Sequence, residues 1–344
     1  MNKKLPIELA IGIIVIVALA VGGAFYFINK DYKTASNIAL KNTKVVSEKN
    51  IETIHDGDLN LRHLTSAEGL VLPETINGDL DLRGLTSAKG LILPEIINGH
   101  LWLHNLKSAE GLVLPKTIHG TLGLSSLTSA KGLVLPKTTH GLLSLNHIES
   151  TENLVLPEII NGGLHLNHLK SAEGLVFPKA INGTLSLNAI TSAKGLVLPK
   201  TIKGALVLPS LKSAEGLVLP ENINGLYTIN LTSAEGLILP KTINGDLRLD
   251  GLTSTKGLIL PKTINGTLSL NGLTSAKGLI LPEAISGRLW LTSLTSANGL
   301  ILPEAIGDVH LYNLPSTEIK KLKKKYPKIK FVTQTARERG RPID

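Results

Sequence analysis

The stretch SAKGLILPEIINGHLWLHNL, residues 87–106, decides the fold, because near-copies of it follow one another along most of the chain. Its proline marks each copy, and successive prolines are 21 residues apart except for Pro220 and Pro240, which are 20 apart. The marking residues are Pro73, Pro94, Pro115, Pro136, Pro157, Pro178, Pro199, Pro220, Pro240, Pro261, Pro282 and Pro303. A period this regular predicts a mainly β solenoid of about 12 coils, each stacked on the next.

One coil can be laid out from its apolar pattern. The alternation in Leu80-Asp81-Leu82 predicts a short strand with both leucines inside and Asp81 exposed. Asn77-Gly78 predicts a turn, because both residue types tolerate a positive φ. A second apolar run, Leu91–Leu93, ends at Pro94, which lacks an amide donor and suits a corner.

Two rows of equivalent residues follow from stacking coils about 4.8 Å apart. The position of Ile92 is always Val or Ile, and we expect it in the core; the alternative is an exposed apolar stripe for lateral contact. The corner asparagines are expected to bond from coil to coil through their side-chain amides. They are Asn77, Asn98, Asn161, Asn182, Asn224, Asn244 and Asn265.

Charge is concentrated at the two ends of the chain. The net charge is +9, yet residues 51–315 hold 19 basic and 21 acidic residues, whereas residues 316–344 hold ten basic and three acidic ones. We therefore expect no nucleic acid on the coils. The chain has no cysteine, which excludes disulfides and thiolate chemistry.

The amino-terminal segment predicts a membrane anchor over residues 1–29. Residues 9–28 carry no charge, and twenty helical residues span about 30 Å, the thickness of a bilayer core. The alternative is a signal peptide cut after Ala18-Leu19-Ala20. With the short basic head Lys3-Lys4, an anchor would place residues 30–344 outside the cytoplasm. Residues 30–53 are expected to form a linker and an amino-terminal cap.

The period stops after residue 315, so the repeat solenoid is assigned to residues 54–315. Residues 316–332 predict a helix–strand cap, in which a helix capped by Ser316 places Ile319, Leu322 and Tyr326 over the last coil. A cap is needed because a bare last coil would expose leucines and an unpaired strand edge. Residues 333–344 form a basic tail.

The unit resembles the bacterial leucine-rich repeat over about residues 54–332, through its length, the Leu80-x-Leu82 strand and the recurring Leu93-Pro94. Two positions depart from that family's consensus, because Leu85 stands where asparagine is expected and Asn77 where leucine is expected. These departures leave a straighter β-solenoid open beside the family's horseshoe. The resemblance implies a protein partner.

Outward strand positions change from coil to coil, and such a rigid face with interchangeable side chains is how solenoids bind. Drift at exposed sites is the competing explanation; two tryptophans favour a binding face, since exposed tryptophan often anchors contacts. The candidate residues are Asp81, Arg83, Trp102, His104, His165, Asn167, Arg248, Asp250, Trp290 and Tyr312.

No catalytic constellation is apparent, since the chain lacks a Gly-rich phosphate loop, His-Glu-x-x-His and Gly-x-Ser-x-Gly. The pairs His119/His140 and His147/His168 stack one coil apart, but no carboxylate is placed beside either, and substitution at a corner explains them better than a metal. We expect no enzyme activity, no cofactor and no metal.

The sequence thus favours a non-catalytic protein-interaction or adhesin-type scaffold displayed on a membrane, with a protein or a surface glycan as partner. The alternative is a passive structural spacer or surface-layer element, and a carbohydrate-active or hydrolytic enzyme is the third hypothesis. The oligomeric state is left open.

Overall fold

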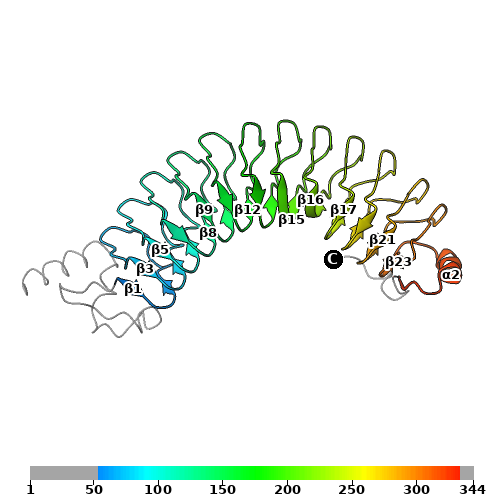
Figure 1. Ribbon diagram of the computed structural model, residues 1–344, viewed down its shortest axis with the longest axis horizontal. Helices are drawn as coiled ribbons and strands as arrows, with labels where there is room; N and C mark the ends of the chain where they lie inside the picture. The colour runs from blue at the N-terminus through cyan, green and yellow to red at the C-terminus, as the bar shows by residue number, and fades with distance from the viewer. Residues whose placement is uncertain (1–52, 334–344) are drawn as a thin grey trace, which may run out of the picture. The chain divides into compact units, whose positions relative to one another are not determined.

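The computed structural model describes residues 53–333, which form a mainly β parallel solenoid of about 13 turns with a helix and a strand at the carboxyl end (Figure 1). The chain divides into two compact units, and the described part of the first is 53–162 and of the second 163–333. Nearly all of the amino-terminal anchor and cap, and of the basic tail, lies outside the described residues. Within residues 53–333 no helix combines the length and apolarity needed to cross a bilayer.

Each turn of the first unit contributes two strands of two residues. The leucine strands, which begin at the first leucine of each Leu-x-Leu, are β2 (Leu59–Asn60), β4 (Leu80–Asp81), β6 (Leu101–Trp102), β8 (Leu122–Gly123) and β10 (Leu143–Ser144). The corner strands, which precede the Asn-Gly corner, are β1 (Ile54–His55), β3 (Thr75–Ile76), β5 (Ile96–Ile97), β7 (Thr117–Ile118), β9 (Thr138–Thr139) and β11 (Ile159–Ile160).

The second unit repeats this pattern with two longer strands inside it. Its leucine strands are β12 (Leu164–His165), β14 (Leu185–Ser186), β18 (Leu247–Arg248), β20 (Leu268–Ser269), β22 (Leu289–Trp290) and β24 (Val309–His310). Its corner strands are β13 (Ala180–Ile181), β17 (Thr242–Ile243), β19 (Thr263–Ile264), β21 (Ala284–Ile285) and β23 (Ala305–Ile306). β15 (Thr201–Val207) and β16 (Asn222–Tyr227) each run through both positions.

Neighbouring turns are joined by parallel ladders in which each residue pairs with its equivalent, 21 positions later in most turns and 20 positions later at two of them. Leu80 pairs with Leu101, and the amides of Leu80 and Leu82 donate to the carbonyls of His100 and Trp102 at 2.8 and 2.9 Å. In each unit the strands gather on one side, the strand side, while the loops project from the other, the loop side (Figure 1). The sequence period is therefore the period of the hydrogen-bonded ladder.

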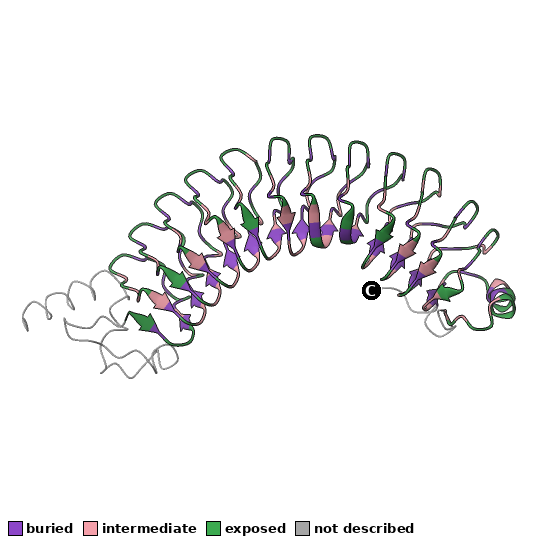
Figure 2. Cartoon of the chain, in the orientation of Figure 1, coloured by how far each residue is buried: buried purple, intermediate pink, exposed green. Residues whose placement is uncertain are grey.

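The core consists of aliphatic columns behind the strands. Leu80, Leu82 and Leu85 are fully buried, and Ala88 and Leu91 on the loop are buried as well. In Figure 2 the buried segments, drawn in purple, recur along the strands and loops of each unit. Fully burying one such leucine contributes about 1.5–3 kcal/mol before the cost of chain ordering is subtracted. The predicted Leu-x-Leu strand is confirmed, whereas the Leu91–Leu93 run forms no strand.

The expected number of turns was one too few. Twelve prolines mark the loops, but those loops separate thirteen leucine strands, and the first of these, β2, precedes Pro73. The number of marking prolines therefore equals the number of loops, which is one fewer than the number of turns.

The two glycines of each turn have different roles from those expected. Apart from Gly57, every glycine with a positive φ in residues 53–333 is a loop glycine, such as Gly111 at 76°. The only non-glycine residue with a positive φ in this range is Asn153, which occupies the same loop position. At the Asn-Gly corner the requirement is space: a Cβ on Gly120 would lie 2.5 Å from the carbonyl oxygen of Gly99. The chain does bend at the predicted Asn77-Gly78 corner. Among the corner glycines of residues 53–333, however, only Gly57 in the first turn has a positive φ, at 88°.

Two corners are a residue short, one between β23 and β24 and one within β16, and the second explains the 20-residue step between Pro220 and Pro240. β15 and β16 pair with an offset of 21 at Ile202 and Ile223, but with an offset of 20 at Ala205 and Gly225. The missing residue is therefore removed at the corner, and the leucine strands on either side keep their alignment, with Leu206 opposite Leu226.

The predicted carboxyl-terminal helix and strand are present. Helix α2 (Ser316–Lys325) buries Ile319 and Leu322, and β25 (Phe331–Val332) pairs in parallel with β24. The hydroxyl of Tyr326 accepts a hydrogen bond from the Leu302 amide at 3.2 Å. The expected capping by Ser316 was wrong, because Ser316 is the first helical residue and the N-cap position is Pro315, which has no side-chain cap.

We predict that the two glycines of one turn respond differently to substitution. Gly111→Asn should change the free energy of unfolding by less than about 1 kcal/mol, because asparagine adopts the left-handed conformation with local hydrogen bonding. Gly120→Ala should cost about 1–3 kcal/mol, because the new methyl group collides with the backbone of the turn below. Urea unfolding followed by circular dichroism measures both, and wild-type stability in Gly120→Ala would contradict the close-contact explanation.

Candidate interaction face

The strand face, defined as the outward residues of the leucine strands and those two positions further on, carries stacked aromatic groups in both units. In the first unit Trp102 lies between two histidines, with its ring centroid 5.0 Å from that of His100 and 5.1 Å from that of His104. The planes of Trp102 and His104 are inclined by only 18°, so these rings are stacked. Burial, followed by the nearby Arg83 charge, lowers the pKa of His104, which favours its neutral form.

A fixed ion pair stands one turn below this aromatic group. Arg83 holds the carboxylate of Asp81 with both Nε and Nη2, at 2.9 Å to Oδ1 and 2.6 Å to Oδ2. Burial raises the pKa of Asp81, but the hydrogen bonds and charge of Arg83 outweigh that effect, and the pKa is lowered overall. Asp81 is only 7% exposed, so its expected exposure was wrong, whereas Arg83 keeps about half of its side chain in solvent.

One turn above Trp102 the chain makes room for the rings. Trp102 pairs with Gly123, and a Cβ there would lie 3.0 Å from both the Trp102 and the His104 rings. The rings therefore lean over the neighbouring turn, where Ser125 bonds to His104 Nδ1 at 3.0 Å and to Ser144 Oγ at 2.8 Å. The four residues predicted in this unit thus meet in one group on β4 and β6, joined by His100, Ser125 and Ser144.

The second unit has an aromatic group on β22 and β24. Trp290 and His310 stack with centroids 4.1 Å apart and planes inclined by 8°, and the Tyr312 ring meets Trp290 edge-on at 6.2 Å. His310 is 8% exposed; its Nδ1 lies 3.2 Å from the Tyr312 hydroxyl, and its buried Nε2 has no hydrogen-bond partner within residues 53–333. Burial, then the Arg288 charge, lowers the pKa of His310 and keeps the imidazole neutral.

A charged group lies in the middle of the second unit. The guanidinium of Arg248 sits 5.2 Å from the centroid of the Tyr227 ring, within the range of a cation–π contact. Asp250 accepts hydrogen bonds from the Ser269 hydroxyl and from the Asn271 amide, so its carboxylate is tied to the next turn. These residues form a group of their own.

The last predicted pair stands at the start of the second unit. His165 on β12 is half-buried, and burial lowers its pKa. The Ser186 hydroxyl donates to the Asn167 side-chain oxygen at 2.7 Å. The ten predicted residues therefore fall into one group in the first unit and three separate groups in the second.

Sequence reasoning missed several members of these groups, and the 21-residue count explains two of them. Tyr227 follows Val207, and His310 follows Trp290, by 20 positions, because in each case the intervening corner is short. A count of 21 lands on the wrong residue there. His100 was missed because it precedes its leucine strand, although the alternation His100, Trp102, His104 was a usable signal for one shared face.

The groups contain one arrangement with catalytic potential, the Ser125–His104 hydrogen bond. A working serine nucleophile also needs a group that orients the histidine, usually a carboxylate. The carboxylate of Asp81 is instead held by Arg83, and Ser125 is the partner of His104 Nδ1, the nitrogen that such a carboxylate normally contacts. Among residues 53–333 no three carboxylates or histidines are placed to hold a metal ion.

These features define a repeat solenoid whose strand face carries aromatic, histidine and charged side chains in fixed groups. The chain matches no family model, no curated protein and no solved structure. Functional inference therefore rests on the geometry of the face itself.

We predict that acid destabilises the protein partly through His165. Because burial lowers its pKa below the ordinary 6.5, the unfolded chain binds more protons, and stability falls as the pH drops through 6.5 towards the folded pKa. His165→Asn should reduce the loss of the urea midpoint between about pH 7.5 and about pH 5. An identical pH dependence in the variant and the wild type would contradict this role.

Proposed function

We propose that this chain is a non-catalytic interaction scaffold of leucine-rich-repeat type, displayed from a membrane, which binds a protein partner through its strand face. The leucine-rich-repeat assignment is supported by the 21-residue turn, with a parallel leucine ladder on the strand side and irregular loops opposite. The membrane display rests on the uncharged run at residues 9–28.

The observation that carries the proposal is the contrast along the strand face. The inward leucines are nearly constant, while the outward position holds Asp81, Trp102, Ser144, Arg248 and Trp290 in different turns on the same backbone lattice. The outward residues are also organised into stacked rings and fixed ion pairs. Aromatic side chains and arginine in such settings are the residues that dominate protein–protein affinity.

A passive spacer is the weaker alternative. A spacer needs only the inward columns, and small polar residues would serve on its surface. Two stacked Trp–His groups with partly exposed indoles place apolar area on the strand face without contributing to the leucine columns. A binding role gives that surface a use.

A hydrolase is the second candidate, favoured only by the Ser125–His104 hydrogen bond. The proposal does not adopt it, because Asp81 is engaged by Arg83 rather than by His104. Without a third group the imidazole has no partner that selects the tautomer needed for proton transfer.

The decisive experiment is capture by the full-length chain, carrying an affinity tag, from a detergent extract of the cells that produce it. We predict that replacing Trp102 and Arg83 by Ser, or Trp290 and Tyr312 by Ser, lowers the yield of a specific bound polypeptide. Loss of one anchoring group at an interface costs about 2 kcal/mol or more, which is about a 30-fold loss of affinity. Quantitative mass spectrometry of the eluate measures the effect.

The matched control is Lys131→Ser with Lys194→Ser, two exposed residues of the loops, which should capture as the wild type does. If both strand-face variants retain the same bound set in the same amounts, the spacer becomes the better explanation. If glycosidase treatment of the extract abolishes capture, the partner is a glycan, and the protein-partner proposal is wrong.

The topology has a separate test. Protease added to intact cells should degrade residues 30–344, because the anchor places them outside the cytoplasm. A tag at residue 344 that resists protease until the cells are lysed would contradict this orientation.

A further inference from the structure

A second surface, here called the flank, runs along the segment of each loop that lies between the loop tip and the marking proline, such as Pro94. Its central residue, expected in the core, is instead exposed in all twelve loops, at 63% to 82% of its full surface. In the first unit these residues are Val71, Ile92, Val113, Val134 and Val155. In the second they are Val176, Val197, Val218, Ile238, Ile259, Ile280 and Ile301.

The composition of this row is not explained by the fold. Both Val and Ile occur, so the position has changed between copies, yet only between β-branched aliphatics. A preference for extended backbone alone would also admit threonine, which is β-branched and polar. Threonine is common elsewhere in the unit, as at Thr75 and Thr117, but stands at none of the twelve flank positions. What is retained is therefore exposed apolar surface.

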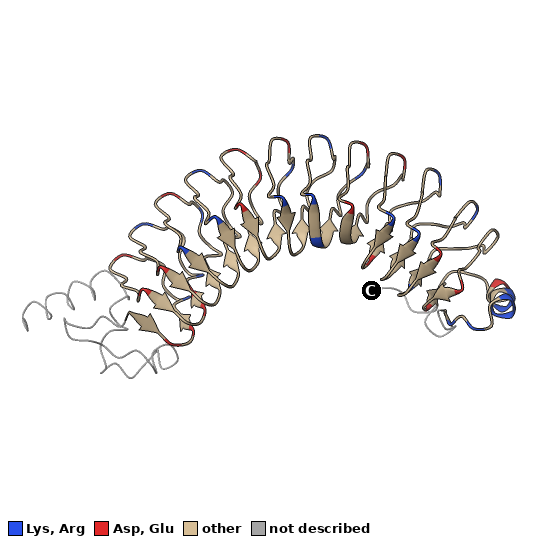
Figure 3. Ribbon diagram, viewed as in Figure 1, with Lys and Arg blue, Asp and Glu red and all other residues tan. Residues whose placement is uncertain are grey.

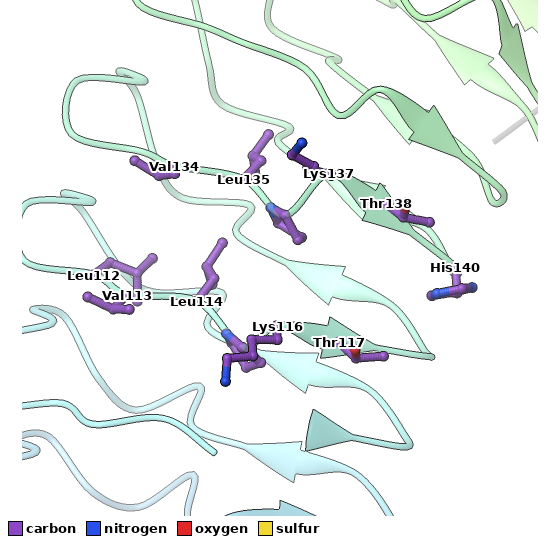
Figure 4. Close-up of a pocket in the computed structure, with 12 residues that line it drawn as sticks. Leu112, Val113, Leu114, Lys116, Thr117, Val134, Leu135, Lys137, Thr138 and His140 are labelled. Atoms are coloured by element: carbon purple, nitrogen blue, oxygen red, sulfur yellow. The ribbon is translucent and has the colours of Figure 1, made fainter. Parts of the chain in front are cut away.

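The flank has grooves between its ridges. In the first unit a groove of about 820 Å³ lies between two neighbouring turns, walled by Leu114 and Pro115 on one side and Leu135 and Pro136 on the other. Figure 4 shows Val113 and Val134 beside it on successive turns. In the second unit a groove of about 400 Å³ occupies the same place, between Val176 and Val197. At these two places the flank therefore combines exposed valines, as knobs, with a largely aliphatic groove between turns, which lysines also border.

A second copy of this chain is the partner whose apolar features repeat with the same spacing. The knob spacing is set by the parallel ladder, so two flanks stay in register over several turns, with the knobs of one facing the grooves of the other. A surface with a different period would lose that match after a few turns.

The apolar area also fits an interface between two copies. An aliphatic side chain of this size offers about 100 Å² when fully exposed, so the seven of the second unit present about 500 Å². A standard interface buries about 800 Å² on each partner, of which about 57% is apolar. The largest apolar patches on soluble proteins measure about 300–600 Å² and often serve in binding, and this row is in that range.

The charges beside the ridge argue against a polyanionic occupant such as anionic lipid or nucleic acid. In the second unit the residue after the proline is Lys in four turns and Glu in three. Figure 3 shows both signs distributed over the loops and corner strands of each unit. A surface with mixed signs gives no field that would attract a polyanion.

We propose that two copies of this chain associate through their flanks, with the Val and Ile ridge of each copy packed into the grooves of the other. This pairing uses a surface distinct from the strand face and does not depend on the proposed function. It leaves the stacked aromatic groups of the strand face free for another partner.

The absence of cysteine makes a direct test possible, because one introduced thiol is the only one in the chain. The full-length protein in detergent should form a covalent dimer with a short bis-maleimide when it carries Val134→Cys or Ile259→Cys. The control Lys324→Cys, on the exposed side of α2, should remain a single chain. The proposal would be overturned if neither flank variant gave more covalent dimer than the control.

A second measurement removes the knobs instead of marking them. Replacing Val113, Val134 and Val155, or Ile238, Ile259 and Ile280, by Ser should raise the dimer dissociation constant at least about tenfold in sedimentation equilibrium. Unchanged unfolding midpoints check that the variants fold, and Trp102→Ser should dimerise as the wild type does. Three results would each contradict the proposal. The first is dimerisation that neither triple variant weakens, and the second is a wild-type protein that has the mass of one chain at tens of micromolar. The third is binding to phosphatidylcholine vesicles that depends on the flank and occurs in place of dimerisation.

Discussion

The coincidence of two periods underlies everything else in this structure. The leucines of one turn pack against each other, and the backbone amides of the same turn pair with the next turn at equivalent residues. Because the hydrophobic columns and the hydrogen-bonded ladder share a 21-residue repeat, neither can shift without breaking the other. Every position in the unit therefore becomes a row along the solenoid within each compact unit.

This constraint does not fix the residues that point outward, and two rows of outward residues differ in how much they vary between turns. On the strand face the outward residue changes from turn to turn, and the differences assemble into local groups such as Trp102 with His104 and Trp290 with His310. On the flank the outward residue is held to Val or Ile although it is mostly exposed. Variety suits recognition of an irregular partner, whereas uniformity suits a partner with the same repeat.

Departures from the period occur where the columns tolerate them. The pairing of β15 with β16 loses one residue at the corner, before Ala205 meets Gly225, so Leu206 still stands opposite Leu226. Asn153 replaces a loop glycine and keeps the left-handed conformation, which asparagine adopts more readily than most residues. At the carboxyl end, α2 covers the last turn with Ile319 and Leu322, which replaces the leucines that a further turn would have supplied.

The sequence alone determined the turn length, the Leu-x-Leu strands, the cross-turn bonding of asparagines such as Asn77 with Asn98, and the closing helix and strand. These features depend on local pattern and on repetition, both of which are visible in one dimension. The tertiary structure decided which way Ile92 points, since a run of three apolar residues on irregular backbone has no alternation to reveal its buried side. It also decided that Asp81 is buried and that Gly120 is needed for space, because both depend on atoms one turn away. Contacts across turns assemble the groups on the strand face, and a single short corner is enough to hide a neighbour such as Tyr227 from any count along the chain.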